Sequence, residues 1–315
     1  MELTRKFPNL GKHDANIAGG KGASLGEMTQ AGIPVPPGFV VLADSFEQFL
    51  TENELHSEIE AALDQVDHEN VNSVEAASEK IRSMILNANF PLDIAKDVEN
   101  NFKELDAEFV AVRSSATAED SSAASWAGEL ESYLNTTKET LLSNIKNCWA
   151  SLFTPRAIFY RIEKEMHKEK VSVAVVVQKM VQSEISGIAF TVHPVTEDKN
   201  QMVIEAGYGL GEAIVGGIVT PDNYVIRKDD LAIEDTYISE QDKMIVRGPE
   251  GTEEVPVSVE KREIQKLPEN EIIELAKICL IIEKHYGFPC DIEWALEKST
   301  IYITQSRPIT TLGNS

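Results

Sequence analysis

The sequence changes character near residues 169–172, and no other feature constrains the fold as strongly. Before this point, residues 52–105 are rich in Glu, Asp, Ala and Asn at helical spacing, and we expect solvent-facing helices there. Residues 137–165 carry apolar residues at helical spacing. Beyond it, runs such as VSVAVVVQKMV, SGIAFTV and QMVIEAGYG have the composition of buried strands and are bounded by turn residues. Two further expected strands, NYVIRK and KMIVRG, suggest a mainly antiparallel region there. We predict two lobes formed by residues 1–169 and 170–315.

Residues 137–165 are expected to form one helix with a buried stripe. Its members recur at helical spacing and are Leu141, Ile145, Cys148, Trp149 and Leu152. We interpret the stripe as a face that packs on the core and not as a cofactor-binding motif.

Charge and cysteine content argue against several classes of protein. The 315-residue chain has a formal net charge of −23, which repels nucleic-acid phosphates, so we expect no nucleic-acid partner. Its three cysteines lie far apart and predict neither a disulfide framework nor a zinc site. The first residues, MELTRKFPNL, lack the apolar core of a signal peptide, and no run has the length of a membrane span. We therefore expect a cytoplasmic protein with no membrane segment.

The segment GGKGASLGEM places glycines around Lys21 at the start of an expected helix. It is not a P-loop, because Ala15 replaces the first glycine of that motif and Gly22, not Ser or Thr, follows the lysine. Backbone N–H groups at a helix start still attract anions, and a lysine adds a positive charge. Two interpretations stay open: a phosphate-binding lysine, or a tight turn followed by an exposed lysine.

The segment VAVRSSATAED leads from an expected strand into a loop rich in serine, alanine and threonine, with Arg113 at the junction. A guanidinium can bind two phosphate oxygens at once, and hydroxyl and N–H groups around it suit the same ligand. The alternative is a capping loop in which Arg113 pairs with Glu119 or Asp120. Spacing alone does not separate these interpretations.

A further glycine-rich segment, EAGYGLGEAIVGG, is close to a dinucleotide-binding motif. After Gly207 and Gly209, the third glycine of that motif would fall at Glu212, and Gly211 comes one residue early. The register disfavours a Rossmann fold and favours a glycine-rich hairpin or a mobile loop over a ligand.

Two segments near the end of the chain, DIEWALE and ITQSRPIT, carry polar residues at alternating positions. Asp291 and Glu293 share one face of an expected strand, and Gln305 and Arg307 do the same on the next. If the strands pair as a hairpin, two carboxylates lie beside an amide oxygen and a guanidinium. Such a set suits Mg²⁺ and a transferring phosphoryl group. The alternative is a surface ion pair between Glu293 and Arg307.

Six segments in this order resemble the N-terminal nucleotide-binding domain of phosphoenolpyruvate synthase. They are GGKGASLGEM, GIPVPPGFVV, AVRSSATAED, VVVQKMV, GLGEAIVGG and the pair DIEWALE…ITQSRPIT. The sequence is also similar to the matching domains of pyruvate phosphate dikinase and rifampicin phosphotransferase, from about Leu10 to Thr311. The resemblance implies an α+β, ATP-grasp-like fold of two lobes that closes on Mg-ATP between them.

The resemblance also implies roles for individual residues. Lys21 and Arg113 would contact the β- and γ-phosphates, and Arg307 would contact the transferring phosphate, so that all three are catalytic. Backbone groups of Met180 and Val181 would read the adenine edge. Asp291, Glu293 and Gln305 would surround Mg²⁺, the last two as its ligands. The positions expected to bind the nucleotide are Lys21, Arg113, Thr117, Gly128, Gln178, Met180, Val181, Glu212 and Asp291.

The chain departs from the family's pattern in two respects. Where relatives usually read close to ASFAGQ followed by an acidic residue and threonine, this chain reads ASWAGELES, which keeps Gly128. Full-length relatives also continue into a swivelling domain with a phosphorylated histidine, and then into a domain for pyruvate or the antibiotic. None of the six histidines here has the Thr- and Gly-rich setting of that phosphohistidine.

We therefore expect an ATP-binding, phosphoryl-donating domain or subunit of the phosphoenolpyruvate synthase type. The accepting histidine, and the domain for pyruvate or another acceptor, would belong to another chain or to a missing C-terminal region. Synthase-like relatives pass on the β-phosphate and release AMP and phosphate. One alternative is a donor domain for an antibiotic or other small-molecule phosphotransferase, and another is a nucleotide sensor that binds ATP without transfer.

Overall fold

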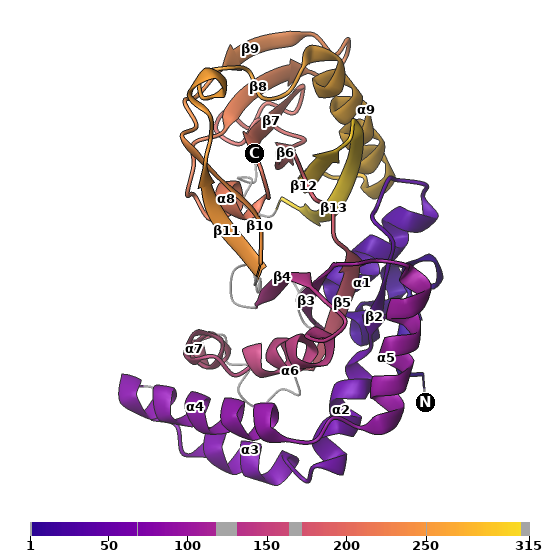
Figure 1. The fold of residues 1–315 in the computed structure, drawn as a ribbon, viewed down its shortest axis with the longest axis vertical. Coiled ribbons are helices and arrows are strands. Elements are labelled where there is room, and N and C mark those ends of the chain that lie inside the picture. The colour runs from indigo at the N-terminus through magenta and orange to yellow at the C-terminus, as the bar shows by residue number, and fades with distance from the viewer. Residues whose placement is uncertain (1, 68, 118–130, 164–171, 250, 310–315) are drawn as a thin grey trace. The chain divides into compact units, whose positions relative to one another are not determined.

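The computed structural model describes residues 2–67, 69–117, 131–163, 172–249 and 251–309 (Figure 1). These residues fall into two compact units. Unit 1 comprises residues 1–27 and 37–180, and unit 2 comprises residues 28–36 and 181–315. Each unit combines helices with antiparallel strands, which confirms the predicted α+β class.

The division between the units differs from the predicted boundary at residues 169–172. Strand β5 (Val173–Lys179) hydrogen-bonds to two strands of unit 1, so that unit extends to Met180. The segment 28–36 belongs to unit 2, where the Pro34 carbonyl accepts a hydrogen bond from the Ile303 N–H (2.9 Å). Composition shows where strands become frequent, but it does not show which strands they pair with.

Unit 1 is built on a five-stranded antiparallel sheet in the order β1-β2-β5-β3-β4. Besides β5, its strands are β1 (Thr4–Lys6), β2 (Gly38–Val41), β3 (Val110–Ala116) and β4 (Ser132–Thr136). Its helices are α1 (Ala15–Gln30, ending in unit 2), α2 (Ala43–Glu52), α3 (His56–Asp64), α4 (Val71–Asn87), α5 (Leu92–Leu105), α6 (Leu141–Ser151) and α7 (Pro155–Glu163). Short 3₁₀ turns at Phe7–Asn9 and Lys12–Asp14 precede α1.

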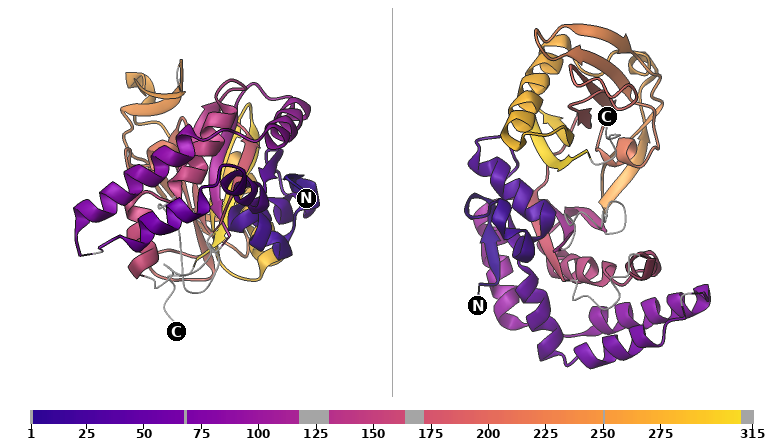
Figure 2. Two further views of the ribbon diagram at one scale, coloured as in Figure 1. Left: turned by 90° about the horizontal axis from the view of Figure 1, so that it is seen from below. Right: turned by 180° about the vertical axis from the view of Figure 1, so that it is seen from behind.

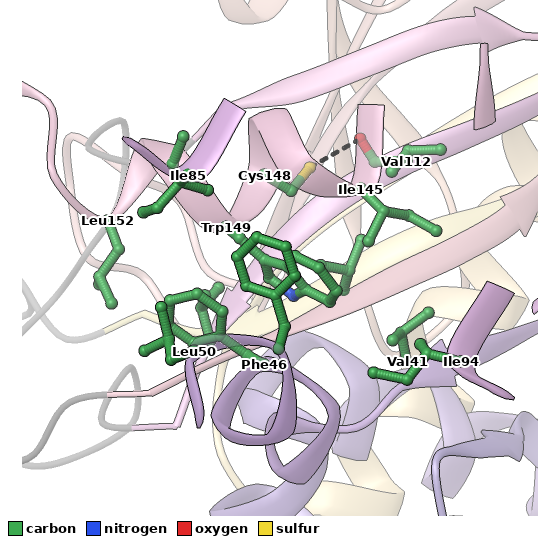
Figure 3. Packing of buried hydrophobic residues seen from close by; sticks show 14 of the residues in the cluster. Val41, Phe46, Leu50, Ile85, Ile94, Val112, Ile145, Cys148, Trp149 and Leu152 are labelled. Carbon is green, nitrogen blue, oxygen red and sulfur yellow. Dashed lines mark hydrogen bonds between the residues drawn. The ribbon is translucent and has the colours of Figure 1, made fainter. Parts of the chain in front are cut away.

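The main core of unit 1 lies on one face of this sheet, where α2 and α6 contact the strands (Figure 3). The Trp149 ring centroid is 4.9 Å from that of Phe49 and 5.6 Å from that of Phe46. The buried thiol of Cys148 donates to the Val112 carbonyl (3.7 Å). The predicted stripe is confirmed, because each of its five members is fully buried: Leu141, Ile145, Cys148, Trp149 and Leu152.

The predicted single helix over residues 137–165 is wrong, because the structure has two helices there. Helix α6 ends at Ser151 and α7 begins at Pro155. Proline has no N–H and fits the first turn of a helix better than its interior. The Thr154 hydroxyl accepts a hydrogen bond from the Ala157 N–H (3.1 Å), which caps the start of α7.

Unit 2 contains a six-stranded sheet in the order β13-β12-β6-β7-β8-β9 and a separate two-stranded hairpin, β10-β11. Its strands are β6 (Ile185–Phe190), β7 (Gln201–Tyr208), β8 (Asp222–Arg227), β9 (Ile233–Tyr237), β10 (Lys243–Gly248), β11 (Gly251–Pro256), β12 (Cys290–Glu297) and β13 (Thr300–Pro308). Its helices are α8 (Glu212–Val215), a 3₁₀ turn (Val259–Lys261) and α9 (Glu269–Tyr286). All six pairings are antiparallel, as predicted, and the antiparallel β7–β8 pair is incompatible with a Rossmann βαβ unit.

The six-stranded sheet separates its residues by face. On β12, Cys290, Ile292 and Trp294 are buried on one face, while Asp291 and Glu293 point to the other. Helix α9 contacts β12 and β7 and covers the apolar face (Figures 1 and 2). The polar residues predicted from DIEWALE therefore lie on the face away from α9. None of the helices in the described part of the chain is long and apolar enough to cross a membrane.

Candidate functional site

Strands β12 and β13 pair as a hairpin, which is the condition that the sequence analysis set, and the register of the hairpin sets a row of four polar side chains. Glu293 lies opposite Gln305, and Asp291 lies opposite Arg307. The Gln305 amide nitrogen donates to Glu293 Oε1 (2.9 Å), and Arg307 Nε donates to Asp291 Oδ2 (2.8 Å). We call these four residues the β12–β13 cluster. The Arg307 guanidinium forms an ion pair with Asp291, whereas the alternative interpretation paired it with Glu293.

An extra residue in β13 determines which way the cluster faces. Ile303 pairs with Trp294 on the apolar face, yet Gln305 pairs with Glu293 on the opposite face. In a regular strand, residues two apart would point the same way. The register shift leaves Thr304 as an extra residue, and such a bulge re-aims the side chains that follow. It allows one short strand to supply both the core and the cluster.

The Asp291 carboxyl is largely enclosed, with 15% of its side chain exposed. Burial raises its pKa, and the adjacent Arg307 guanidinium only partly opposes this rise. Its Oδ1 atom is buried and has no hydrogen-bond partner among the described residues. A buried carboxylate oxygen without a donor favours a cation or another ligand at this position.

Glu205 on β7 adds a third carboxylate to the same face. In register, Glu293 pairs with Ile188 of β6, and Ile188 pairs with Glu205. Burial raises the pKa of Glu205, and the negative charge of Asp291 raises it further. Sequence analysis missed this residue. Its signal was a single acidic residue inside QMVIEAGYG, whose neighbours Ile204 and Ala206 are fully buried.

The donor set of this face fits a hard divalent cation. Three carboxylates face one guanidinium, that of Arg307, whose side chain is 44% exposed. Within the described ranges, no group of three or more His, Cys, Asp or Glu residues could hold a metal ion by itself. Mg²⁺ rarely needs such a cage, because one or two carboxylates usually hold it together with phosphate oxygens and water.

In unit 1, the turn that carries Lys21 lies against the end of the strand that carries Arg113. Gly19 interrupts α1 with a left-handed φ of 68°. A Cβ at this glycine would overlap the hydroxyl and carbonyl of Ser115, and the Gly22 N–H donates to the Ser115 hydroxyl (3.3 Å). Since Ser115 follows Arg113 by two residues in β3, both predicted phosphate-binding residues belong to one region of unit 1.

The residues of β5 and of the segment after it that were predicted to bind the nucleotide are buried or already hydrogen-bonded. Gln178 is buried and pairs in register with Ala111 of β3. The Met180 N–H donates to the Phe109 carbonyl (3.0 Å), so adenine recognition by this residue would rest on its carbonyl. Val181 is buried as well.

Three further predicted positions have different outcomes. The Thr117 hydroxyl donates to the Ser172 carbonyl (3.1 Å), which ties β3 to the start of β5. Glu212 is half-buried and begins the one-turn helix α8. Gly128 lies outside the described residues, as do Glu119 and Asp120, the alternative partners of Arg113.

Comparison with known proteins gives a family match over nearly the whole chain. Residues 15–315 match the family described as pyruvate phosphate dikinase, AMP/ATP-binding domain. The chain is 47% identical to a probable phosphoenolpyruvate synthase of Methanocaldococcus jannaschii, covering 99% of this chain and 27% of that relative. It is 41% identical to a phosphoenolpyruvate synthase of Pyrococcus furiosus (97% and 43%) and 40% identical to a rifampicin phosphotransferase of Bacillus cereus (97% and 36%). The chain thus spans less than half the length of each of these relatives.

Proposed function

Because the chain belongs to the family of pyruvate phosphate dikinase AMP/ATP-binding domains, we propose that it binds Mg-ATP and donates a phosphoryl group to a histidine. The histidine would lie on another domain or chain, and pyruvate would be the final acceptor, as in a phosphoenolpyruvate synthase. The observation that carries this proposal is the β12–β13 cluster. It places acidic, amide and guanidinium groups on one sheet face, and such a set suits Mg²⁺ and a transferring phosphoryl group.

In this proposal, unit 2 holds the metal and stabilises the moving phosphoryl group. Glu293 and Gln305 would ligate Mg²⁺, and the unpaired Oδ1 of Asp291 lies in the same row. Bound Mg²⁺ would supply neutralisation of phosphate charge. Arg307 would hold the transferring group through a guanidinium that Asp291 orients from one side (2.8 Å). Charge that develops during transfer is then met by a fixed donor.

Unit 1 would contribute residues that bind nucleotide phosphates. Lys21 and Arg113 would bind the β- and γ-phosphates, and the Gly19–Ser115 contact keeps their two elements together. Thr117, Gly128, Gln178 and Glu212 would add nucleotide contacts, and the backbone of Met180 and Val181 would meet the adenine. We further propose an ATP-grasp-like arrangement and a cytoplasmic location. Three buried cysteines outside any disulfide are compatible with a reducing compartment.

A donor domain of an antibiotic phosphotransferase is the second candidate function. It is supported by the 40% identity to the Bacillus cereus rifampicin phosphotransferase over 97% of this chain. The two candidates use the same donor chemistry and differ in the acceptor, which belongs to residues outside this chain. A choice between them therefore depends on the acceptor domain supplied in the experiment.

The test is incubation of the chain with Mg-ATP and a histidine-bearing domain from a phosphoenolpyruvate synthase. We expect phosphohistidine to form together with AMP and phosphate, and pyruvate to discharge it once the pyruvate-binding domain is added. The chain alone should bind Mg-ATP and hydrolyse it slowly, because the accepting histidine is proposed to lie on another domain or chain. Rapid ATP hydrolysis by the chain alone, or ADP release without phosphohistidine, would contradict the proposal.

A further inference from the structure

Unit 2 contains a buried ion pair that the proposed chemistry does not use. Lys266 Nζ lies 2.8 Å from Asp222 Oδ1, and both side chains are fully buried. The Asp222 carboxylate also accepts from the Ser239 N–H (3.0 Å), the Lys266 N–H (2.8 Å) and the Tyr224 hydroxyl (2.8 Å). Removing two charges from water is costly, and apolar residues often stabilise a core as well as such a pair does. The pair therefore calls for an explanation beyond stability.

The pair holds the end of the glycine-rich segment that follows β7. Asp222 is the first residue of β8, directly after this segment. The Ser239 hydroxyl donates to the carbonyl of Thr220, and the Lys266 ammonium donates to the carbonyl of Ser239. Residues 220–222 are thus bound to Ser239 and Lys266 by side-chain and backbone groups together.

Gln241 holds the start of the same segment. Its Oε1 accepts from the Tyr208 N–H (2.8 Å), and its Nε2 donates to the carbonyls of Tyr208 (3.1 Å) and Lys243 (2.9 Å). The side chain thereby takes the place of a strand pairing between the end of β7 and β10. The next bond along the chain joins the Leu210 N–H to the Ile245 carbonyl (2.8 Å).

The two anchors of the glycine-rich segment are Gln241 at its start and Ser239, itself bound by Lys266, at its end. Between the two ends of the segment lie α8 and Glu212, flanked by Gly209 and Gly217, whose φ angles of 87° and 65° are left-handed. Glycine-rich chain loses much conformational entropy on ordering, so a defined position for α8 depends on how its ends are fixed. Helix α8 contacts β6, β7 and β10, and β10 begins two residues after Gln241 (Figure 1).

We propose that Gln241, Asp222 and Lys266 form a clamp that fixes both ends of residues 208–222 and so positions Glu212 for the nucleotide. They are positioning residues, since they act through the segment and not on the nucleotide itself. The assignment to nucleotide binding rests on the proposed function. The clamp itself rests on the hydrogen bonds above.

The test compares Gln241→Met with Lys228→Met in the full chain. Gln241→Met removes three hydrogen bonds and leaves no buried charge, so folding is expected to survive. Lys228→Met breaks an ion pair of the same unit, between Lys228 and Glu283 (2.8 Å), that does not touch the segment. We expect Gln241→Met to speed amide hydrogen exchange at residues 209–217 by about tenfold or more, and to weaken Mg-ATP binding by about tenfold.

The rate of transfer to a supplied histidine domain at saturating Mg-ATP should change less than twofold in Gln241→Met. A loss of unit-wide folding would instead affect exchange throughout unit 2 and lower that rate. The double variant Asp222→Asn/Lys266→Met releases the other end of the segment and should also speed amide hydrogen exchange at residues 209–217. Lys228→Met should change neither exchange at residues 209–217 nor Mg-ATP binding.

Two results would overturn the proposal. Unchanged exchange at residues 209–217 in both clamp variants would show that the anchors do not fix the segment. Faster exchange with unchanged Mg-ATP affinity would show that the segment is clamped for another purpose. If wild type fails to bind Mg-ATP, the proposed function fails, while the exchange comparison still decides whether the clamp exists.

Discussion

In unit 2, the residues of the β12–β13 cluster take their positions from the hydrogen-bond register of two adjacent strands. In unit 1, Lys21 and Arg113 lie far apart in the sequence, and a contact between a helix turn and a strand end brings their elements together. The first arrangement is fixed by many backbone bonds, so single substitutions change its chemistry and not its geometry. The second depends on one missing Cβ at Gly19, so a single methyl group can disturb it. The two regions should therefore fail in different ways.

The largest effect is expected in unit 2, where a side chain can lose its function without harm to the fold. Glu293→Gln keeps the size and the strand position but removes the charge needed to hold Mg²⁺. Phosphoryl transfer should fall by a factor on the order of 10³, with the unfolding midpoint nearly unchanged. The control is Glu234→Gln in the same sheet, whose carboxylate pairs with Arg227 (3.2 Å). Transfer at the wild-type rate in Glu293→Gln would remove this residue from the metal site.

The contact in unit 1 should show the opposite behaviour, a loss of stability. Gly19→Ala adds a methyl group that would overlap Ser115, in a left-handed conformation that alanine rarely adopts. We expect the free energy of unfolding to fall by about 3 kcal/mol. Gly32→Ala is the matched control, because its φ of 74° is similar but no atom lies within 4 Å of the added Cβ. It should cost only about 1 kcal/mol. Equal losses in a denaturant titration would show that the Ser115 contact does not matter.

A smaller effect on the free energy of unfolding is expected at Glu205, where a substitution should raise stability and not lower it. Burial and Asp291 raise the pKa of this carboxyl, so the native state binds more protons than the unfolded state just above the ordinary pKa. Stability then falls as the pH rises through that window. Glu205→Gln should stabilise the metal-free chain at pH 7 by about 1 kcal/mol and flatten this pH dependence. Mg²⁺ with ATP should bind this variant more weakly. Denaturation curves at pH 5 and pH 7 that match wild type would contradict the assignment.

The sequence predicted the secondary structure of the strand-rich half well, because each strand there is an apolar run with clear boundaries. It also predicted that the four cluster residues share a face, since alternation on two adjacent strands is a local property. It did not predict the extra residue at Thr304, whose effect depends on the pairing partner. Without that bulge, Gln305 would lie on the same face as Ile303 and away from Glu293. The prediction that the four residues share a face was correct, although the bulge that makes it so could not be seen in the sequence.

Long-range contacts account for what could not be predicted. The glycines around Lys21 indicated a turn, but only the structure shows that Gly19 meets Ser115 of β3. The buried charges of Asp222 and Lys266 carry no local signal, because they pair across elements that are distant in the sequence. The extent of unit 1 up to Met180 also depends on long-range contacts, those of β5 with β2 and β3.

The most direct test of the account compares two arginines, Arg307 and Arg113, by Mg-ATP calorimetry and by transfer to a histidine domain. Arg307→Ala should reduce transfer by about 10²–10³-fold while ATP affinity changes by less than about threefold, because this guanidinium acts mainly on the moving group. Arg307→Lys, which can still pair with Asp291, should recover only part of the rate if bidentate contact with phosphate matters. Arg113→Ala should weaken binding and transfer together. If Arg307→Ala lost binding and transfer equally, or Arg113→Ala lost neither, the proposed phosphoryl-donor mechanism would be contradicted.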